Sequence, residues 1–271
     1  MRKQNIVVAG WGAVGQCVDE ALRPVANIFI DDPYHAIACQ RSTQPSDLAD
    51  LDAVIICVAT PANVHNNSCD TSFVEEVIEK YGTKPRYLLK STITPDFFAK
   101  PYMLDGVECK ITYSPEYIRG TTGNDYVTDF KNATFAIYGG GEMRWWDELF
   151  RLVQPNMKDV RYMTAAQASF TKYFLNCYLA AKTTFFNHMK DIVDHMPSMG
   201  DPDYDIIIDG LCLDPRVSKS HTQVPGPDGK KGFGGHCFPK DVSAMSWMST
   251  DLGVENNFLD TVLNFNDTYR K

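Results

Sequence analysis

Residues 6–22, IVVAGWGAVGQCVDEAL, decide the fold of this chain. The first four are an apolar run of the kind that forms a buried strand. Glycines follow at positions 10, 12 and 15, and residues 16–22 have the spacing of a helix. A strand, a glycine-rich turn and a helix in this order predict a dinucleotide-binding unit, although the glycine pattern alone would be weak support.

The three glycines have separate tasks in such a unit. Gly10 permits the tight turn, Gly12 lets a pyrophosphate approach the backbone, and Gly15 permits close packing of the helix on the strand. A second apolar run, residues 28–30, ends at Asp31, whose carboxylate would accept hydrogen bonds from ribose hydroxyls and repel a 2′-phosphate. The predicted cofactor is therefore NAD, with its phosphates at the helix N-terminus. Its predicted contacts in the turn are Gly10, Gly12, Ala13, Val14 and Gly15.

Composition excludes several classes of protein. The 271 residues carry a formal net charge of −8, which argues against a nucleic-acid or anionic-membrane surface. The apolar runs are too short to span a bilayer, and the N-terminus passes straight into the first strand without a signal peptide. The eight cysteines form no CxxC pair and the six histidines no HxxxH or HExxH pair. We therefore expect reduced thiols, a cytoplasmic location and no metal site.

The first part of the chain alternates apolar runs with helical stretches. Further strands are expected at residues 53–59, 87–89, 110–113 and 134–138, and a helix at residues 72–81 with Phe73, Val77 and Ile78 on one face. This alternation predicts a Rossmann-type α/β domain, residues 1–163, with a doubly wound parallel sheet. Ligands of such sheets bind beyond the carboxyl ends of the strands. Five residues that follow strand ends could share one crevice: Gly10, Asp31, Thr60, Thr92 and Glu116.

The remaining residues, 164–271, predict a mainly helical domain. Residues 165–195 read as one long central helix. Shorter helices are expected at residues 204–211, 242–248 and 259–266. The long helix has apolar residues at helical spacing, namely Phe170, Phe174, Cys177, Ala181 and Phe185.

Residues 232–241, GFGGHCFPKD, are the strongest candidate for chemistry. Gly234 and Gly235 have no Cβ, so a ligand can approach their backbone closely. A helix that began near Pro239 would direct free N–H groups toward Cys237, and Lys240 adds positive charge. Most cysteines in a turn are buried structural thiols. Here the glycines and charges instead favour a nucleophilic thiolate.

Polar residues elsewhere support this interpretation. Lys172 and Asn176 are four residues apart and so share a helix face. Such a pair is usually solvated, but the aromatic neighbours of Lys172 favour a packed site in which an ammonium can stabilise an oxyanion. Asp241 is either a partner of the helix dipole or a base that acts through water. Glu116 is either a surface acid or an activator of water, which Thr92 could hold.

In chain order these residues resemble the UDP-glucose/GDP-mannose dehydrogenases, NAD-dependent enzymes that oxidise a nucleotide-sugar alcohol twice to the acid. The final motif is highly specific, and KST at 90–92 and SPE at 114–116 are moderately so. The resemblance runs through residues 10–15, 58–61, 90–92, 114–117, 214–217 and 232–241, and through Asp70, Lys172, Tyr173, Asn176, Lys182 and Asn187.

The resemblance implies a role for each residue. Cys237 would be the nucleophile, and Asp241 with a water would take the alcohol proton. Lys172 and Asn176 would steady the oxyanion, and Thr92 and Glu116 would position the water that hydrolyses a thioester. Further cofactor contacts would come from Thr60, Pro61, Thr92 and Lys240. Substrate contacts would come from Glu116, Tyr117, Ile118, Lys172, Asn176, Arg216, Phe233, Gly234 and Cys237. Arg216 matches an arginine that crosses a dimer interface, so we expect a homodimer built on the helical domain.

The sequence also departs from the family pattern. Ser169 and His188 stand where acids are usual, and no Glu follows Arg119 at the usual place. The loop before the cysteine motif is longer, with residues 228–231 as the additional segment. Family members have a third, C-terminal domain that binds the nucleotide, and the sequence ends soon after the helix that should lead into it. The identity of the sugar therefore stays open.

Two other functions share features with this sequence. A two-electron dehydrogenase of the β-hydroxyacid type also pairs a Rossmann domain with a helical domain that carries Lys and Asn four apart, but it needs no Cys237. A non-catalytic NAD-binding protein would have no reason to keep all six catalytic candidates. The intact cysteine motif therefore favours the four-electron oxidation.

Overall fold

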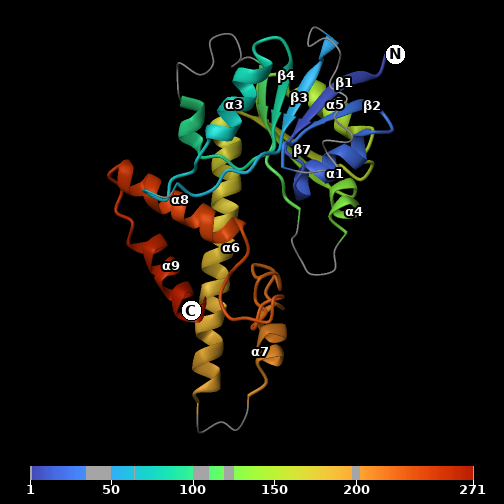
Figure 1. The fold of residues 1–271 in the computed structure, drawn as a ribbon. Coiled ribbons are helices and arrows are strands. Elements are labelled where there is room, and N and C mark those ends of the chain that lie inside the picture. The colour runs from blue at the N-terminus through green and yellow to red at the C-terminus, as the bar shows by residue number, and fades with distance from the viewer. Residues whose placement is uncertain are drawn as a thin grey trace. The chain divides into compact units, whose positions relative to one another are not determined.

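The computed structural model describes residues 2–34, 50–63, 65–99, 110–118, 125–196 and 202–270 (Figure 1). It divides into two compact units. The sheet unit comprises Met1–Pro61 and Cys69–Lys172, and the helical unit comprises Ala62–Ser68 and Tyr173–Lys271.

The described part of the sheet unit contains a seven-stranded sheet in the order β2-β1-β3-β4-β5-β6-β7. Its strands are β1 (Gln4–Ala9), β2 (Ala26–Asp31), β3 (Ala53–Ile56), β4 (Arg86–Leu89), β5 (Ile111–Tyr113), β6 (Phe135–Gly140) and β7 (Asp159–Met163). The predicted α/β class is confirmed. The sheet is mixed rather than wholly parallel, because β6 pairs antiparallel with β5. Apolar runs do not encode strand direction, so the sequence carried no sign of this reversal.

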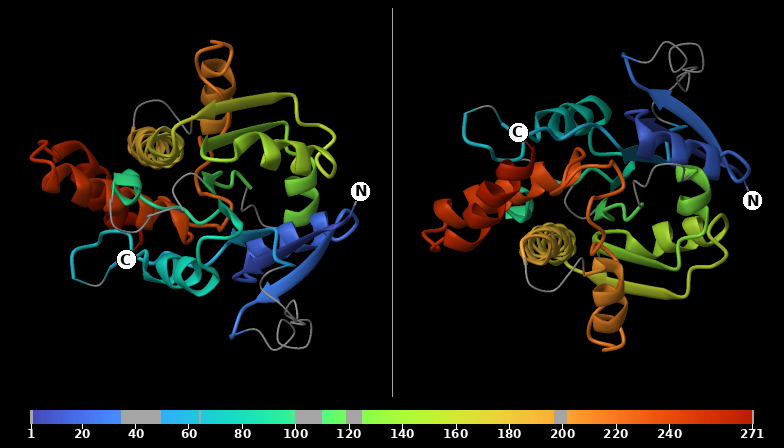
Figure 2. Two further views of the ribbon diagram at one scale, coloured as in Figure 1. Left: turned by 90° about the horizontal axis from the view of Figure 1, so that it is seen from above. Right: turned by 90° about the horizontal axis from the view of Figure 1, so that it is seen from below.

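Helices cover both faces of the sheet (Figure 2). Alternate strand residues point to opposite faces: Val7, Val54 and Ile56 join the cluster that includes α3 (Ser72–Tyr81). Ile6 and Ile55 join the cluster of the other face. That face is covered by α1 (Ala13–Leu22), α4 (Tyr126–Lys131) and α5 (Met143–Arg151). The central strands are therefore buried on both sides, as their continuous apolar sequence predicts.

Several details of the sheet unit differ from expectation. The third strand ends at Ile56 rather than at residue 59. In α3, Phe73 is exposed, and the buried face is made by Val74, Val77 and Ile78. Strand β7 and helices α4 and α5 were not predicted from the sequence. The missed strand β7 has no buried residue, so it lacks the apolar run by which a strand is recognised.

The helical unit is built on the long helix α6 (Ala165–Asp194), which was predicted almost to its ends. The helices α7 (Tyr204–Leu211), α8 (Cys237–Asp251) and α9 (Asn257–Arg270) follow. The boundary predicted near Met163 differs from the compact units, which divide within α6 after Lys172. The first turns of α6 belong to the sheet unit because Ala168 packs in its core and the Ser169 hydroxyl donates to the Ile93 carbonyl at 2.6 Å.

The two sides of α6 in the helical unit are unlike. Tyr173, Asn176 and Ala180 are buried beneath α8 and α9. Phe174 and Phe185, predicted as part of an apolar stripe, are 61% and 54% exposed. Cys177 and Ala181 of the same predicted stripe pack against the core, so the stripe is divided between the core and an exposed aromatic face.

Helix α8 begins at Cys237, two residues before the predicted start at Pro239. A proline fits the first turn because the first four N–H groups of a helix have no partner within it. Asp241 consequently lies in the second turn and is fully buried, so it is not a first-turn partner of the dipole.

None of the helices in the described ranges has the length and apolar character needed to cross a membrane.

Candidate functional site

The glycine turn after β1 has the geometry that its spacing predicts. Gly10 has φ +87°, and a Cβ there would lie 2.7 Å from the Val58 nitrogen. A Cβ on Gly15 would lie 2.0 Å from the Gly10 oxygen. Gly12, by contrast, would meet nothing described within 4 Å. Two glycines therefore allow the chain to pack on itself, while the third leaves open space at the start of α1, where a pyrophosphate would fit.

Gly12 is the N-cap of α1 and has no side chain that could accept from the first N–H groups of the helix. Asp31, the predicted ribose acceptor, ends β2, and its Oδ2 accepts hydrogen bonds from Lys80 Nζ at 2.7 Å and from the Tyr81 hydroxyl at 2.8 Å. Burial and the contact with Asp31 raise the pKa of Tyr81, so it remains a donor. The residues present thus fit a dinucleotide, with a carboxylate oriented by two donors.

The loops after the neighbouring strands are joined to one another. The hydroxyl of Thr60, after β3, donates to the carbonyl of Thr92, after β4, at 2.7 Å. The Ser91 hydroxyl donates to the Val58 carbonyl at 2.7 Å. Pro61 is exposed beside this junction. Thr60 and Thr92, predicted to meet at the carboxyl edge of the sheet, are therefore in direct contact.

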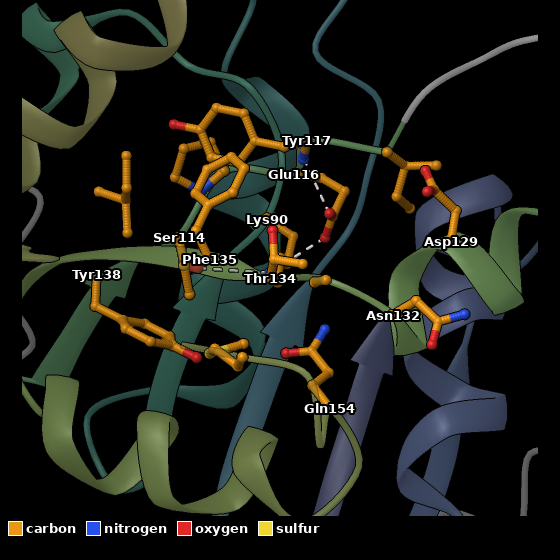
Figure 3. A pocket seen from close by; sticks show the side chains of 16 residues that line it. Lys90, Ser114, Glu116, Tyr117, Asp129, Asn132, Thr134, Phe135, Tyr138 and Gln154 are labelled. Carbon is orange, nitrogen blue, oxygen red and sulfur yellow. Dashed lines mark hydrogen bonds and ion pairs between the residues drawn. The ribbon is translucent and has the colours of Figure 1, made fainter. Parts of the chain in front are cut away.

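Glu116, after β5, is held by Lys90, after β4. Lys90 Nζ lies 3.2 Å from Glu116 Oε2, and the other carboxylate oxygen accepts from the Tyr117 N–H at 2.9 Å. The lysine is 8% exposed, and its ammonium lies 5.2 Å from the ring centroid of Phe150. Figure 3 shows Lys90 and Glu116 on the wall of a pocket of about 260 Å³. Tyr117 and Ile118, both predicted to bind substrate, also line it.

Lys172 also contacts this segment. Its Nζ donates to the Glu116 carbonyl at 2.7 Å and lies 4.9 Å from the centroid of the Tyr117 ring. The ammonium is therefore fixed beside the backbone that carries Glu116. Thr92, Glu116 and Lys172, three of the six predicted catalytic residues, all lie in the sheet unit.

The helical unit carries the other three: Asn176, Cys237 and Asp241. Cys237 is exposed at the first residue of α8. Asp241 is 0% exposed, and its Oδ2 accepts from Asn176 Nδ2 at 2.6 Å. Its Oδ1 pairs with Lys240 Nζ at 2.6 Å. The carboxylate one turn after the thiol is thus buried and hydrogen-bonded at both oxygens.

Two buried asparagines fasten the loop that precedes Cys237. Asn187 Oδ1, on α6, accepts from the Gly232 N–H at 2.9 Å. Asn266 Oδ1, on α9, accepts from the Phe233 N–H at 2.7 Å. The sequence analysis did not find Asn266, since one Asn in an amphipathic helix carries no signal that separates it from a solvated residue.

The remaining predicted substrate contacts lie in different environments. The Phe233 side chain is 3% exposed in the core of the helical unit, so only its backbone is available to a ligand. Gly234 is half-buried. The Arg216 side chain is 86% exposed and pairs with Asp214 at 2.5 Å.

Three other thiols lie within or against the cores of the two units. Burial raises the pKa of Cys17 to about 11 and the pKa values of Cys57 and Cys177 to about 12. These thiols are protonated at neutral pH and are poor nucleophiles. Cys39 and Cys109 lie outside the described residues. Within the described ranges, no group of three or more His, Cys, Asp or Glu side chains is arranged to hold a metal ion.

Comparison with known proteins identifies relatives of both units. Residues 166–268 match the model described as "UDP-glucose/GDP-mannose dehydrogenase family, central domain". The GDP-mannose 6-dehydrogenase of Pseudomonas aeruginosa is 26% identical over 234 residues, which cover 80% of this chain and 51% of that protein. The chain spans about half the length of the curated relatives it matches.

Solved structures share the fold. A UDP-glucose dehydrogenase from Pyrobaculum islandicum superposes with a TM-score of 0.76 at 22% identity, covering 98% of this chain and 68% of that one. A 3-hydroxyisobutyrate dehydrogenase of Mycobacterium tuberculosis superposes with a TM-score of 0.68 at 15% identity, covering 98% and 94%. Since enzymes of both kinds have this fold, the fold alone does not choose between their chemistries.

Proposed function

We propose that the chain is a member of the UDP-glucose/GDP-mannose dehydrogenase family and that it oxidises the primary alcohol of a nucleotide sugar to the carboxylate, with two NAD as electron acceptors. One observation carries the proposal. Cys237 is exposed at the start of α8, and one helical turn later Asp241 is fully buried against Asn176. A two-electron alcohol dehydrogenase has no use for such a thiol, whereas oxidation of an aldehyde through a thioester requires it.

NAD would supply the hydride acceptor. The open space at Gly12, the uncapped start of α1 and the Asp31 carboxylate support its binding to the sheet unit. The acid at the end of β2 favours NAD over NADP.

The chain's own residues would divide the remaining chemistry. Asp241, through a water, takes the proton of the alcohol, which becomes an aldehyde as a hydride leaves. The Cys237 thiolate adds to the aldehyde carbon to give a thiohemiacetal, and loss of a second hydride gives a thioester. Water then displaces the thiol and leaves the carboxylate. In sum, one alcohol, one water and two NAD⁺ give one carboxylate, two NADH and three protons.

Two lysine ammonium groups, each held in place by a contact with Glu116, would interact with negatively charged groups in the reaction. The Lys172 ammonium, held by the Glu116 carbonyl, would stabilise the oxyanion together with Asn176. Lys90 fixes the Glu116 carboxylate in an orientation from which it would activate the hydrolytic water, with Thr92 as a second contact.

The helical unit also supports the proposal of a homodimer. Phe174, Tyr178 and Phe185 form an exposed face of α6, with exposures of 61%, 61% and 54%. On α7, Ile206 is 70% exposed. Large apolar side chains exposed on one helix face favour association. A second copy is the proposed occupant, and Arg216 would then reach the substrate of the partner.

The test is the stoichiometry of NADH formation, followed by ultraviolet absorbance, with UDP-glucose, GDP-mannose and other nucleotide sugars in turn. We expect two NADH per sugar from the unaltered protein and severe loss in Cys237→Ser. One NADH per alcohol, unaffected by Cys237→Ser, would identify a two-electron dehydrogenase. Bound NAD without turnover of any nucleotide sugar would refute the proposed activity for these substrates.

A further inference from the structure

Arg270, at the end of α9, lies against the loop that leads into Cys237. Its Nη2 donates to the Gly232 carbonyl at 2.7 Å. A Cβ added to Gly234 would lie 2.8 Å from Arg270 Nη1 and 3.0 Å from its Cζ. The guanidinium therefore occupies the space that a side chain at position 234 would enter.

Asp228 holds this guanidinium from the other side. Arg270 Nη1 donates to Asp228 Oδ2 at 2.5 Å, and the hydrogen bond lowers the pKa of Asp228. The Asp228 carboxylate also accepts from the Lys230 N–H at 3.1 Å, and the Lys230 carbonyl accepts from the Gly226 N–H at 2.8 Å. Asp228 belongs to the additional segment, residues 228–231, that distinguishes this chain from the family pattern.

A second contact fixes the frame in which Arg270 lies. Asp191, on α6, pairs with Lys231 Nζ at 2.5 Å and accepts from the Tyr269 hydroxyl at 2.6 Å. The additional segment and the end of α9 are thus both fastened to α6. The Arg270 side chain between them is 19% exposed, so little of it is free to swing into solvent.

We propose that Arg270 is a positioning residue for Cys237: it bridges the additional segment 228–231 and the glycine loop 232–235, and so holds the loop in the conformation from which α8 begins. The inference rests on the proposed function only in taking Cys237 as the nucleophile. The planar guanidinium contacts Asp228 and Gly232 at once, which a lysine ammonium cannot reproduce.

The test compares Arg270→Ala, Arg270→Lys and Asp228→Asn with a matched control, Lys219→Ala. Lys219 pairs with Asp209 at an exposed site of the same unit. Hydrogen exchange is measured on peptides that span residues 232–237, and turnover is measured on nucleotide sugars. We expect the exchange rate of these peptides to rise about tenfold in the three variants at Arg270 and Asp228, and not in Lys219→Ala. We expect kcat to fall about tenfold with little change in the KM for NAD, since a small displacement of a nucleophile is costly.

Wild-type exchange in Arg270→Ala would overturn the proposal. Wild-type exchange and kcat in Arg270→Lys would also overturn it, because charge alone would then suffice. If Arg270→Ala does not fold, Asp228→Asn, which retains the arginine, decides. If the unaltered protein turns over no nucleotide sugar, the proposed function fails while the exchange data still decide the role of Arg270.

Discussion

Exposure separates Cys237 from the thiols buried in the two cores. Cys237 is exposed at the first residue of α8, whereas burial raises the pKa values of Cys57 and Cys177 to about 12. A thiol reacts as its thiolate and only where a reagent reaches it. Of the three thiols compared, we therefore expect Cys237 to be the reactive nucleophile.

Alkylation should be selective for that sulfur. At pH 8, iodoacetamide should label Cys237 at least about tenfold faster than Cys17, Cys57 or Cys177, because Cys17 is buried, Cys57 and Cys177 are partly buried, and desolvation raises the pKa of all three. Mass spectrometry of the digested protein measures each rate. Equal rates at Cys237 and Cys57 would contradict the burial on which the expectation rests.

The buried carboxylate of Asp241 depends on its partners. Asn176→Ala would remove the donor to Oδ2 and leave a fully buried charge with one partner fewer. We expect the free energy of unfolding to fall by about 1–3 kcal/mol. Urea denaturation of the variant and of the unaltered protein provides the comparison. An unchanged midpoint would mean that water replaces the amide.

At the scale of elements, the turn between β1 and α1 shows how two glycines one turn apart can differ. A side chain at Gly15 would meet the Gly10 backbone, whereas one at Gly12 would meet no described atom. Gly15 therefore permits the helix to pack on the strand, whereas Gly12 borders open space.

The substitutions Gly15→Ala and Gly12→Ala form a matched pair. Gly15→Ala should lower the free energy of unfolding by about 1–3 kcal/mol, because backbone must move to admit the methyl group. Gly12→Ala should change it by about 1 kcal/mol or less. It should nevertheless weaken NAD binding about tenfold, which calorimetry would detect. Unaltered NAD affinity in Gly12→Ala would remove this turn from the cofactor site.

Helix α6 likewise contains positions that differ in burial, over a greater length. Tyr173 and Asn187 lie on its buried side, and Tyr178 and Phe185 on its exposed side. Residues three, four or seven apart share a face, so periodicity reveals a stripe. It does not reveal which stripe is covered, because both sides of this helix carry aromatic residues.

At the scale of the whole molecule, the exposed side of α6 determines the expected assembly. Tyr178→Glu with Phe185→Glu would place charges on that face and should convert a dimer to a monomer. Light scattering after gel filtration measures the mass. A monomeric unaltered protein, or a dimer that survives both substitutions, would contradict the proposed interface.

Stability should also fall in acid. Although burial opposes the effect, hydrogen bonds from Lys231 and Tyr269 lower the pKa of Asp191 below 3.8. The unfolded state therefore binds more protons near that pH, so the free energy of unfolding declines as pH falls from about 5 through the lowered pKa. We therefore expect the melting temperature to fall less steeply with decreasing pH in Asp191→Asn than in the unaltered protein. If both proteins show the same pH dependence of the melting temperature, Asp191 does not contribute to the loss of stability in acid.

The sequence by itself determined the glycine turn between β1 and α1, the α/β class and the long helix α6. It also singled out Cys237 and Asp241. Tight turns, close backbone approach and helix periodicity restrict which residue types can stand at a position, so they leave a local mark that can be read without neighbours.

Only the tertiary structure decided the reversed direction of β6, the start of α8 at Cys237 and the covered side of α6. It also decided that Asn266 and Arg270 hold the cysteine loop. These features depend on which distant segment fills a given space, and many residue types satisfy such a contact. The clearest case is Gly234, whose residue type permits a close neighbour without saying that the neighbour is Arg270.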